Sequence, residues 1–452
     1  MSKALGKRPG NDSLTLTYST RLRIDNVEDR RYLDNRFEYY AHIEHELFNG
    51  LAHGKLESKG LRDRTAHKYG ISGRQANSLV HKTLGRLASL KALKKLEKSA
   101  LTQRIWSIEA KIQSLSDKIS VLKQDASENI ITDKQLHKLR ALKAKKHRLS
   151  LKLNQLRQRL AEFDKRANSL CFGTKRLFKA QFHLEDSGFA SHGDWLREWR
   201  KARANSWYFL GASAEHLGNQ NCQYDINKES LFVRMDTVKL KHIVINGVKF
   251  PHGADEIRAA QQNGQPVTCK IQKTERKYYL RASVALPKPM AVTYEAHGSI
   301  GLDYNKGFIQ ACDVSGDGNI TGFMKYHLPD SGKNKAMGET ALRTAVKAIA
   351  EKAAQTGRPV IIENLDFTKK KALSNKHVSK RKKYNSMINS FDYSRYIEYL
   401  ESACYKAGVR LSKVNPYKTS KTGSERYAKR KGINTHQAAS YAIGRLGLGF
   451  HI

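Results

Sequence analysis

Two long stretches of the chain repeat apolar residues at alternating spacings of three and four positions, and this pattern constrains the fold most strongly. The first run consists of Ile105, Ile108, Ile112, Leu115, Ile119 and Leu122, and the second of Leu142, Leu149, Leu153, Leu156, Leu160 and Phe163. Such spacing places the side chains on one face of a helix that packs against another helix. Because the segment 124–133 between the runs is short and polar, we expect an antiparallel coiled-coil hairpin. Its Lys- and Arg-rich outer faces fit either a solvated surface or a nucleic-acid wall.

The regions on both sides of this hairpin have different patterns. Residues 14–24 alternate apolar and polar side chains and are expected to form a strand, whereas 27–167 as a whole is typical of helices. Between 168 and 295 several short segments alternate with period two, and a small β-barrel is the natural way to close that many short strands. The aromatic residues there fit a core better than a base-stacking surface; they are Trp195, Trp199, Trp207, Tyr208 and Phe209.

Charge indicates the class of partner. The chain has 82 Lys and Arg against 42 Asp and Glu, a net charge of +40. Repulsion on this scale opposes compaction unless a polyanion neutralises it, and nucleic acid is the obvious candidate. A purely architectural protein is the simpler alternative. The sequence has no apolar run near the roughly 18 residues of a membrane span and no signal-peptide core, so we expect a cytoplasmic protein without membrane contacts.

A helix-turn-helix pattern occurs between residues 61 and 90. A first helix, a turn at Gly70 and a second helix place four polar side chains where they could contact DNA: Arg74, Gln75, Asn77 and Lys82. An ordinary helical hairpin with a solvated basic face explains the same pattern equally well.

Two acidic residues interrupt apolar strands in the C-terminal third. Asp303 follows Gly301 and Leu302 within a predicted strand, and Glu363 ends the buried parallel strand predicted at 359–362. Carboxylates at the carboxyl ends of such strands are where α/β sheets keep their sites. Two of them on adjacent strands could hold divalent ions about 4 Å apart, the arrangement that assists phosphodiester hydrolysis. Asp317, in contrast, belongs to an ordinary hairpin turn.

These motifs resemble those of the transposon-encoded TnpB nucleases and the related type V CRISPR effectors, in which a RuvC-like domain is split into three motifs. GLDYN supplies the first acid as Asp303 and IIENLDF the second as Glu363. The basic loop 369–383 should contact phosphate, and we include Lys380, Arg381, Lys382 and Lys383 among the nucleic-acid-binding residues. The helix and Asn-Pro…Thr-Ser segment at 395–423 and the stretch 172–182 fit the same family.

The chain departs from the family pattern at two places. The paired CxxC motifs of a zinc knuckle are absent, since the five cysteines stand far apart, and we therefore expect no zinc. The third metal ligand, an Asp in the family, aligns with His436. A neutral imidazole can ligate a divalent ion. The alternatives are that His436 caps a helix, that the ligand has been lost, or that Asp313 or Asp366 replaces it.

The resemblance implies a multidomain α+β protein with an RNase H-like (RuvC) domain at residues 296–452. Residues 1–26 and 168–295 would form a wedge-type β-barrel, and 27–167 a helical recognition domain. We expect an RNA-guided DNA endonuclease that binds guide RNA and double-stranded target DNA. Asp303 would bridge two Mg²⁺ ions, or Mn²⁺ ions, with Glu363 and His436 completing one each. A nuclease-inactive RNA-guided repressor and a guide-independent RuvC-type accessory nuclease of transposition remain alternatives.

Overall fold

The computed structural model describes residues 14–128, 132–165, 168–213, 215–235, 241–274, 277–287, 289–305, 307–329, 335–364, 393–416 and 419–451. The fold is mixed α+β, and the chain divides into two compact units after Leu286. Each unit has its own hydrophobic core. Residues 287–295 group with the second unit, since Val292 N donates to Gly408 O and Tyr294 N to Gly357 O.

The strands of the first unit form two sheets around one core. The four-stranded sheet has the order β1-β7-β6-β2, with β1 (Leu14–Leu22), β7 (Lys277–Leu286), β6 (Thr268–Thr274) and β2 (Ser206–Phe209). The three-stranded sheet is β3 (Cys222–Asp225), β4 (Ser230–Arg234) and β5 (His242–Ile245). The helix α7 (Ala254–Gln262) and the 3₁₀ turn η2 (His216–Gly218) lie between strands. Among the described residues no ladder joins the two sheets, so the predicted barrel is present as two packed sheets.

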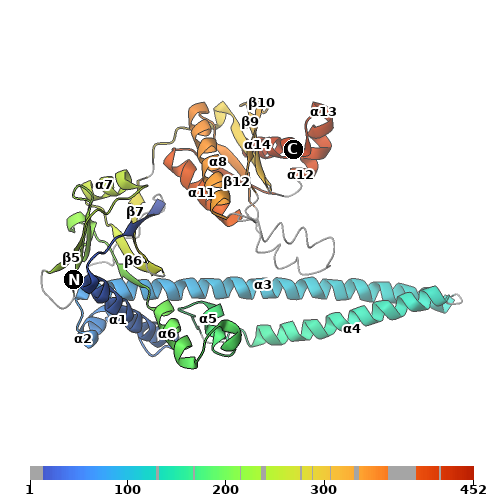
Figure 1. The fold of residues 1–452 in the computed structure, drawn as a ribbon. Coiled ribbons are helices and arrows are strands. Elements are labelled where there is room, and N and C mark those ends of the chain that lie inside the picture. Colours follow the sequence, from blue (N-terminus) through green and yellow to red (C-terminus); the bar gives the residue numbers. More distant parts are fainter. Residues whose placement is uncertain are drawn as a thin grey trace. The chain divides into compact units, whose positions relative to one another are not determined.

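The helices of this unit are α1 (Val27–Ala52), α2 (Leu61–Tyr69), α3 (Gly73–Glu128) and α4 (Asp133–Ala161). The predicted coiled-coil hairpin is confirmed, and its first arm is the continuation of α3 (Figure 1). The seam buries Ile105, Ile108 and Leu115 against residues of α4, including Leu149, Leu153 and Leu156. Exposed ion pairs from Arg157 to Glu109 and from Lys98 to Asp164 join the two helices in the antiparallel direction.

A small helical module, residues 168–205, joins α4 to β2. It contains α5 (Lys175–Ala180), the 3₁₀ turn η1 (Glu185–Ser187) and α6 (His192–Arg203). Phe172 attaches the module to the helices, since its ring lies 3.9 Å from that of His45 and 5.4 Å from that of Phe48. The predicted core role of the aromatic residues holds for four of the five, since Trp195, Trp199, Trp207 and Phe209 are buried and Tyr208 is half-buried.

The second unit is a five-stranded mixed sheet in the order β10-β9-β8-β11-β12. Its strands are β8 (Ser299–Asn305), β9 (Phe308–Val314), β10 (Ile320–His327), β11 (Val360–Glu363) and β12 (Leu411–Val414). The strands β8, β11 and β12 run parallel, whereas β9 is antiparallel to both neighbours. The 3₁₀ turn η3 (Glu295–His297) precedes the sheet.

Helices cover both faces of this sheet. The helices α8 (Lys335–Thr356) and α11 (Tyr393–Lys406) pack on the face that presents Ile300, Leu302 and Ile362. The helix α14 (Thr435–Gly447) covers the opposite face, where Tyr441 packs on Cys312 and Val314. Before α14 the chain forms α12 (Thr419–Thr422), the π-helical turn η4 (Gly423–Ala428) and α13 (Lys429–Lys431).

In the part of the chain that the structure describes, no helix combines the length and hydrophobicity that crossing a membrane requires.

Candidate functional site

The position of α14 on the sheet depends on two glycines that allow close backbone contact. A Cβ atom at Gly301 of β8 would lie 2.1 Å from Ser440 O and 2.4 Å from Gly444 N. Ser299 Oγ donates to Gly444 O at 2.9 Å. Since Ser299 contacts Gly444 and Gly301 reaches back to Ser440, the helix runs antiparallel to β8. Four helical residues rise about 6 Å and two strand residues about 6.6 Å, so the two elements stay in step. One turn before Ser440 is His436, which this match places beside Asp303.

Asp303 is held by two neighbours from different elements. Its Oδ2 lies 3.0 Å from His436 Nδ1 and accepts a hydrogen bond of 2.8 Å from Asn305 Nδ2. The Asp303 side chain is 12% exposed, whereas that of His436 is 47% exposed. The His436 ring packs edge-on against Phe308, with centroids 5.0 Å apart. The carboxylate is therefore recessed while the imidazole faces the solvent side of the site.

Glu363 has a different set of partners. Thr419 Oγ1, which is buried, donates to Glu363 Oε1. Tyr393 Oη donates to the Glu363 backbone carbonyl at 2.8 Å, and Asn364 N donates to Val414 O at 2.8 Å. The end of β11 is thus anchored on both sides, and one carboxylate oxygen of Glu363 is oriented by a neutral hydroxyl.

The register of the parallel strands brings the two acids to neighbouring positions. Leu302 pairs with Ile362, so Asp303 and Glu363 each follow a paired residue at the carboxyl end of its strand. Adjacent strands lie about 4.8 Å apart. Side chains alternate between faces, and since Ile300, Leu302 and Ile362 belong to the opposite core, both acids point to the face that α14 covers.

A column of tyrosines supports this end of the sheet from the other face. The ring of Tyr304 stacks on that of Tyr396, with centroids 4.1 Å apart and planes at 4°. The ring centroid of Tyr393 lies 5.8 Å from that of Tyr396. Burial raises the pKa of Tyr396 well above its ordinary value. This phenol therefore stays neutral and serves as packing beneath the strand that carries Asp303.

The cap of α14 is Asn434. Its side chain accepts from His436 N at 3.0 Å and Gln437 N at 2.9 Å, and Gln437 Oε1 accepts from Asn434 N. The capping alternative for His436 is therefore wrong, because Asn434 already satisfies the first turn. The side chain of His436 is left to contact Asp303. The sequence analysis did not single out Asn434, and it noted Thr419 only as part of the Asn-Pro…Thr-Ser segment, without a contact to Glu363.

The donor set fits a divalent cation in its chemistry. Asp303 and Glu363 offer carboxylate oxygens on one face, and His436 adds an imidazole nitrogen. Within the described ranges, no three His, Cys, Asp or Glu side chains come together closely enough to hold a metal ion. Of the three side chains, His436 and Asp303 are in direct contact. Glu363 lies at the end of the neighbouring strand, where it contacts Thr419.

The other predicted site residues lie elsewhere. Asp313, on the β9 strand, pairs with Lys352 of α8. It is the partner of Ile300 in the β8–β9 ladder and so points to the face opposite Asp303. Asp313 therefore does not replace the third ligand. Asp366, Lys380, Arg381, Lys382 and Lys383 lie outside the described residues.

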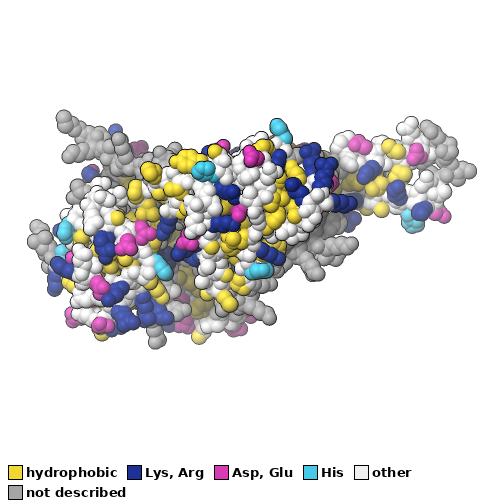
Figure 2. Space-filling view, turned by 90° about the horizontal axis from the view of Figure 1, so that it is seen from above, with side chains coloured by type: hydrophobic (Ala, Val, Ile, Leu, Met, Phe, Trp, Pro, Cys, Tyr) yellow, Lys and Arg dark blue, Asp and Glu magenta, His cyan; other side chains and the backbone are white. Residues whose placement is uncertain are grey.

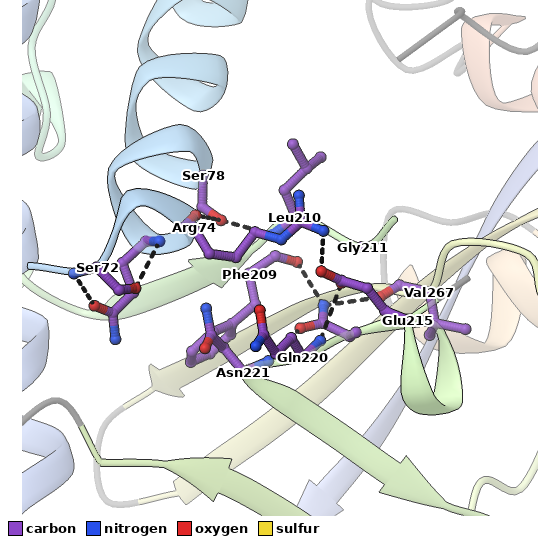
Figure 3. Close-up of polar contacts among 12 residues, drawn as sticks. Ser72, Arg74, Ser78, Phe209, Leu210, Gly211, Glu215, Gln220, Asn221 and Val267 are labelled. Atoms are coloured by element: carbon purple, nitrogen blue, oxygen red, sulfur yellow. Dashed lines mark hydrogen bonds and ion pairs between the residues drawn. The ribbon is translucent and has the colours of Figure 1, made fainter. Parts of the chain in front are cut away.

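The four helix-turn-helix residues are mostly engaged within the protein. Arg74 pairs with Glu215, and Gln75 is buried and exchanges hydrogen bonds with Ser72. Ser78 Oγ accepts from Leu210 N, which ties the same turn of α3 to β2 (Figure 3). Lys82 Nζ lies 2.8 Å from Glu44 Oε2, and Asn77 is half-buried. This geometry favours the ordinary helical turn over a row of DNA-contacting side chains at these positions.

Two cations face each other across neighbouring strands of the four-stranded sheet. Lys270 of β6 lies directly opposite Arg281 of β7. Burial, together with Lys82, Arg281 and Arg86, lowers the pKa of Lys270 to about 8, and Glu44 opposes this only in part. Like charges paired across strands destabilise a sheet, so an anion bound there would relieve the repulsion. Figure 2 shows Lys and Arg side chains in several groups over the face in view.

Comparison with known proteins gave similarity to solved structures only; no family model and no curated protein matches the chain. The chain is similar to a Cas12f1–sgRNA–target DNA complex, with 11% identity, a TM-score of 0.39 and coverage of 96% of this chain and 99% of that one. It is similar to a CRISPR-Cas12f ternary complex with 13% identity and a TM-score of 0.24, over 95% of this chain and 98% of that one. It is similar to a Cas12i1 R-loop complex before target DNA cleavage with 11% identity and a TM-score of 0.20, over 86% of this chain and 53% of that one.

Proposed function

We propose that this chain is an RNA-guided DNA endonuclease that cleaves target DNA by metal-assisted phosphodiester hydrolysis in a RuvC-like site. The observation that carries the proposal is the pair of acids at the ends of adjacent parallel strands, Asp303 and Glu363, with His436 in contact with the first. These are the residues that the TnpB resemblance assigns to the three RuvC motifs. The partners proposed are a guide RNA and double-stranded target DNA.

The side chains of the site would divide the work as follows. Asp303, Glu363 and His436 would hold the divalent ions, which when bound activate water and stabilise the leaving 3′ oxygen. Asn305 orients Asp303 through one oxygen, and Thr419 orients Glu363. Hydrogen-bonded partners of this kind fix the direction of ligand lone pairs. Gly301 keeps α14 on the sheet, so that His436 stays beside Asp303.

The charge of the chain supports a nucleic-acid substrate. A net charge of +40 and the cross-strand pair of Lys270 and Arg281 both favour binding to phosphate backbones. In an RNA-guided complex, base pairing with the guide would supply the sequence specificity and the protein would hold the backbone.

A second candidate, a nuclease-inactive RNA-guided binder, is favoured by one contact. The hydrogen bond between His436 Nδ1 and Asp303 Oδ2 engages two of the proposed ligands with each other. A cation held by both atoms requires this bond to break. In the inactive alternative the bond would be permanent, and the chain would bind target DNA without cutting it.

The test begins with the RNA that co-purifies with the protein. Sequencing that RNA gives the guide, and a matching duplex is then incubated with the complex and Mg²⁺ or Mn²⁺. We expect metal-dependent cleavage that Asp303→Asn and Glu363→Gln abolish while DNA binding remains. Asp317→Asn is the matched control, since Asp317 is exposed in the hairpin turn that follows β9.

Each alternative gives a distinct result in the same assay. Guided binding without cutting by the wild-type complex supports the inactive binder. Cleavage of branched DNA in the absence of any guide supports the accessory nuclease. If Asp303→Asn still cuts at the wild-type rate, the site is wrong.

A further inference from the structure

An aromatic column runs from the core of the 168–205 module to its surface. The rings of Trp195 and Trp199 stack with centroids 5.9 Å apart and planes at 13°. The ring centroid of Phe178 lies 5.7 Å from that of Trp199, and that of Phe182 lies 6.3 Å from that of Phe178. The exposed fractions rise along this order, from 4% and 8% for the tryptophans to 45% for Phe178 and 69% for Phe182. The outer end of the column is therefore a phenyl ring with its surface open to solvent.

The base of the column is rigid. Trp195 Nε1 donates to Leu177 O at 2.7 Å, which fixes the tryptophan against α5. A Cβ atom at Gly173 would lie 2.4 Å from Trp199 Cζ3, so the backbone lies directly on the indole ring. The two tryptophans therefore give the outer phenylalanines a fixed support, and a phenyl side chain has few rotamers to lose when a flat ligand stacks on it.

The basic residues of the same short segment indicate the kind of ligand. Lys175, Arg176 and Lys179 of α5 are exposed, and none of them has an ion pair among the residues that the structure places. On α6, in contrast, Asp194 and Glu198 pair with basic residues of their own helix. Exposed acids also occur nearby, at 185–186 in η1.

An exposed aromatic ring in the same short segment as three exposed cations fits a nucleotide, whose base stacks while its phosphate meets the positive charge. An apolar protein partner would use the rings but would gain nothing from three adjacent cations. Charge complementarity therefore favours a nucleic acid over a protein or a second copy of this chain.

We propose that Phe182 and Phe178, with Lys175, Arg176 and Lys179, form a stacking platform for an unpaired nucleotide of a single-stranded nucleic acid. The platform rests on the proposed function only in the class of partner, and it does not require cleavage. The buried tryptophans are its foundation, not its contact surface.

The first test uses tryptophan emission as a local signal, with Asp303→Asn as the background and a chelator present. Phe182→Trp places an indole at the platform, and Val27→Trp places one at a position that is also 69% exposed. A single-stranded oligothymidylate should quench the added emission of Phe182→Trp by stacking, and inorganic polyphosphate should not. Equal quenching at both positions, or by polyphosphate, overturns the proposal.

The second test separates stacking from apolar contact. Phe182→Leu keeps an apolar side chain but removes the π face, and should weaken oligothymidylate binding about fivefold or more, at a salt concentration that suppresses non-specific phosphate binding. Phe182→Trp should retain affinity. Unchanged affinity of Phe182→Leu overturns the proposal, and self-association lost in Phe182→Leu would assign the patch to a second copy instead. Because cleavage is absent throughout, these outcomes are independent of the nuclease proposal.

Discussion

His436 Nδ1 lies 3.0 Å from Asp303 Oδ2, although the two residues are 133 positions apart. The contact depends on α14 running antiparallel to β8, with Gly301 against Ser440 and Asp303 against the first turn of the helix. Since Asn434 caps that turn, His436 has no capping duty. The side chain that the resemblance aligns with the third ligand therefore contacts Asp303, the proposed first acid.

Substitution of His436 tests its role as a ligand. His436→Ala should lower guided cleavage by more than about 100-fold with little change in DNA binding, because one donor of the proposed site is lost. His436→Asp should retain cleavage and shift the metal preference towards Mg²⁺, which favours oxygen. Cleavage rates are measured in Mg²⁺ and in Mn²⁺. Wild-type rates for His436→Ala in both metals would exclude a ligand role.

Thr419 should support catalysis without touching the substrate. Thr419→Val keeps the shape of the side chain but removes the hydroxyl that donates to Glu363 Oε1. Loss of a residue that orients a ligand costs about 10- to 100-fold in activity or metal affinity. We expect this loss for Thr419→Val and recovery for Thr419→Ser, measured as cleavage rate against Mn²⁺ concentration.

The control for Thr419 is Thr356→Val, since Thr356 is exposed and its hydroxyl donates to carbonyls of its own helix. A Thr419→Val variant with an unchanged metal requirement would show that the hydroxyl is only structural.

The sequence predicted elements better than contacts. The apolar spacing in α3 and α4 was enough to predict that the two helices pack along one face. Asp303 and Glu363 could be recognised because a carboxylate within an apolar strand is costly unless it serves a site. Whether short strands close into a barrel depends on pairings far apart in the chain, and here they form two sheets. For the same reason no local pattern indicated that Thr419 contacts Glu363.

Burial also decided roles that the pattern left open. Arg74 and Lys82 have the spacing of DNA-contacting residues, but Glu215 and Glu44 come to them from distant segments. The stretch 172–182 fitted the family pattern, but the sequence could not show that Phe182 is exposed, because exposure depends on what the rest of the chain leaves uncovered. Its signal was the position of two phenylalanines four residues apart in a basic segment.

Close packing between β8 and α14 predicts a large effect of a single methyl group. Gly301→Ala places a Cβ atom against backbone atoms of Ser440 and Gly444, which can move only if the helix moves. Overpacking of this kind typically costs about 1–3 kcal/mol, and it should also abolish cleavage by displacing His436. Gly322→Ala in β10, where the added atom would be 3.5 Å from its nearest neighbour, should change the unfolding free energy little. Denaturant unfolding of both variants measures the difference, and equal stability of the two would contradict the observed packing.

A half-buried imidazole, His45, makes the first unit less stable in acid. His45 Nδ1 lies 2.8 Å from Arg203 Nη2, and since a guanidinium only donates, this nitrogen must accept and the ring must be neutral. Burial, followed by the charges of Arg203, Arg86, Lys82 and His42, lowers the pKa of His45 to about 3. The unfolded chain then takes up the proton first as pH falls. The stabilisation that neutral His45 gives the folded state is therefore complete above an unfolded pKa of about 6.5 and is lost progressively towards pH 3.

Allowing for screening, we expect a loss of folding stability on the order of 1 kcal/mol between about pH 7 and 5. His45→Asn keeps an acceptor that does not titrate in this range, and other titrating groups cancel between the two proteins. Urea unfolding should therefore show a smaller pH dependence for His45→Asn than for the wild type, and identical pH profiles would mean that His45 is not held neutral.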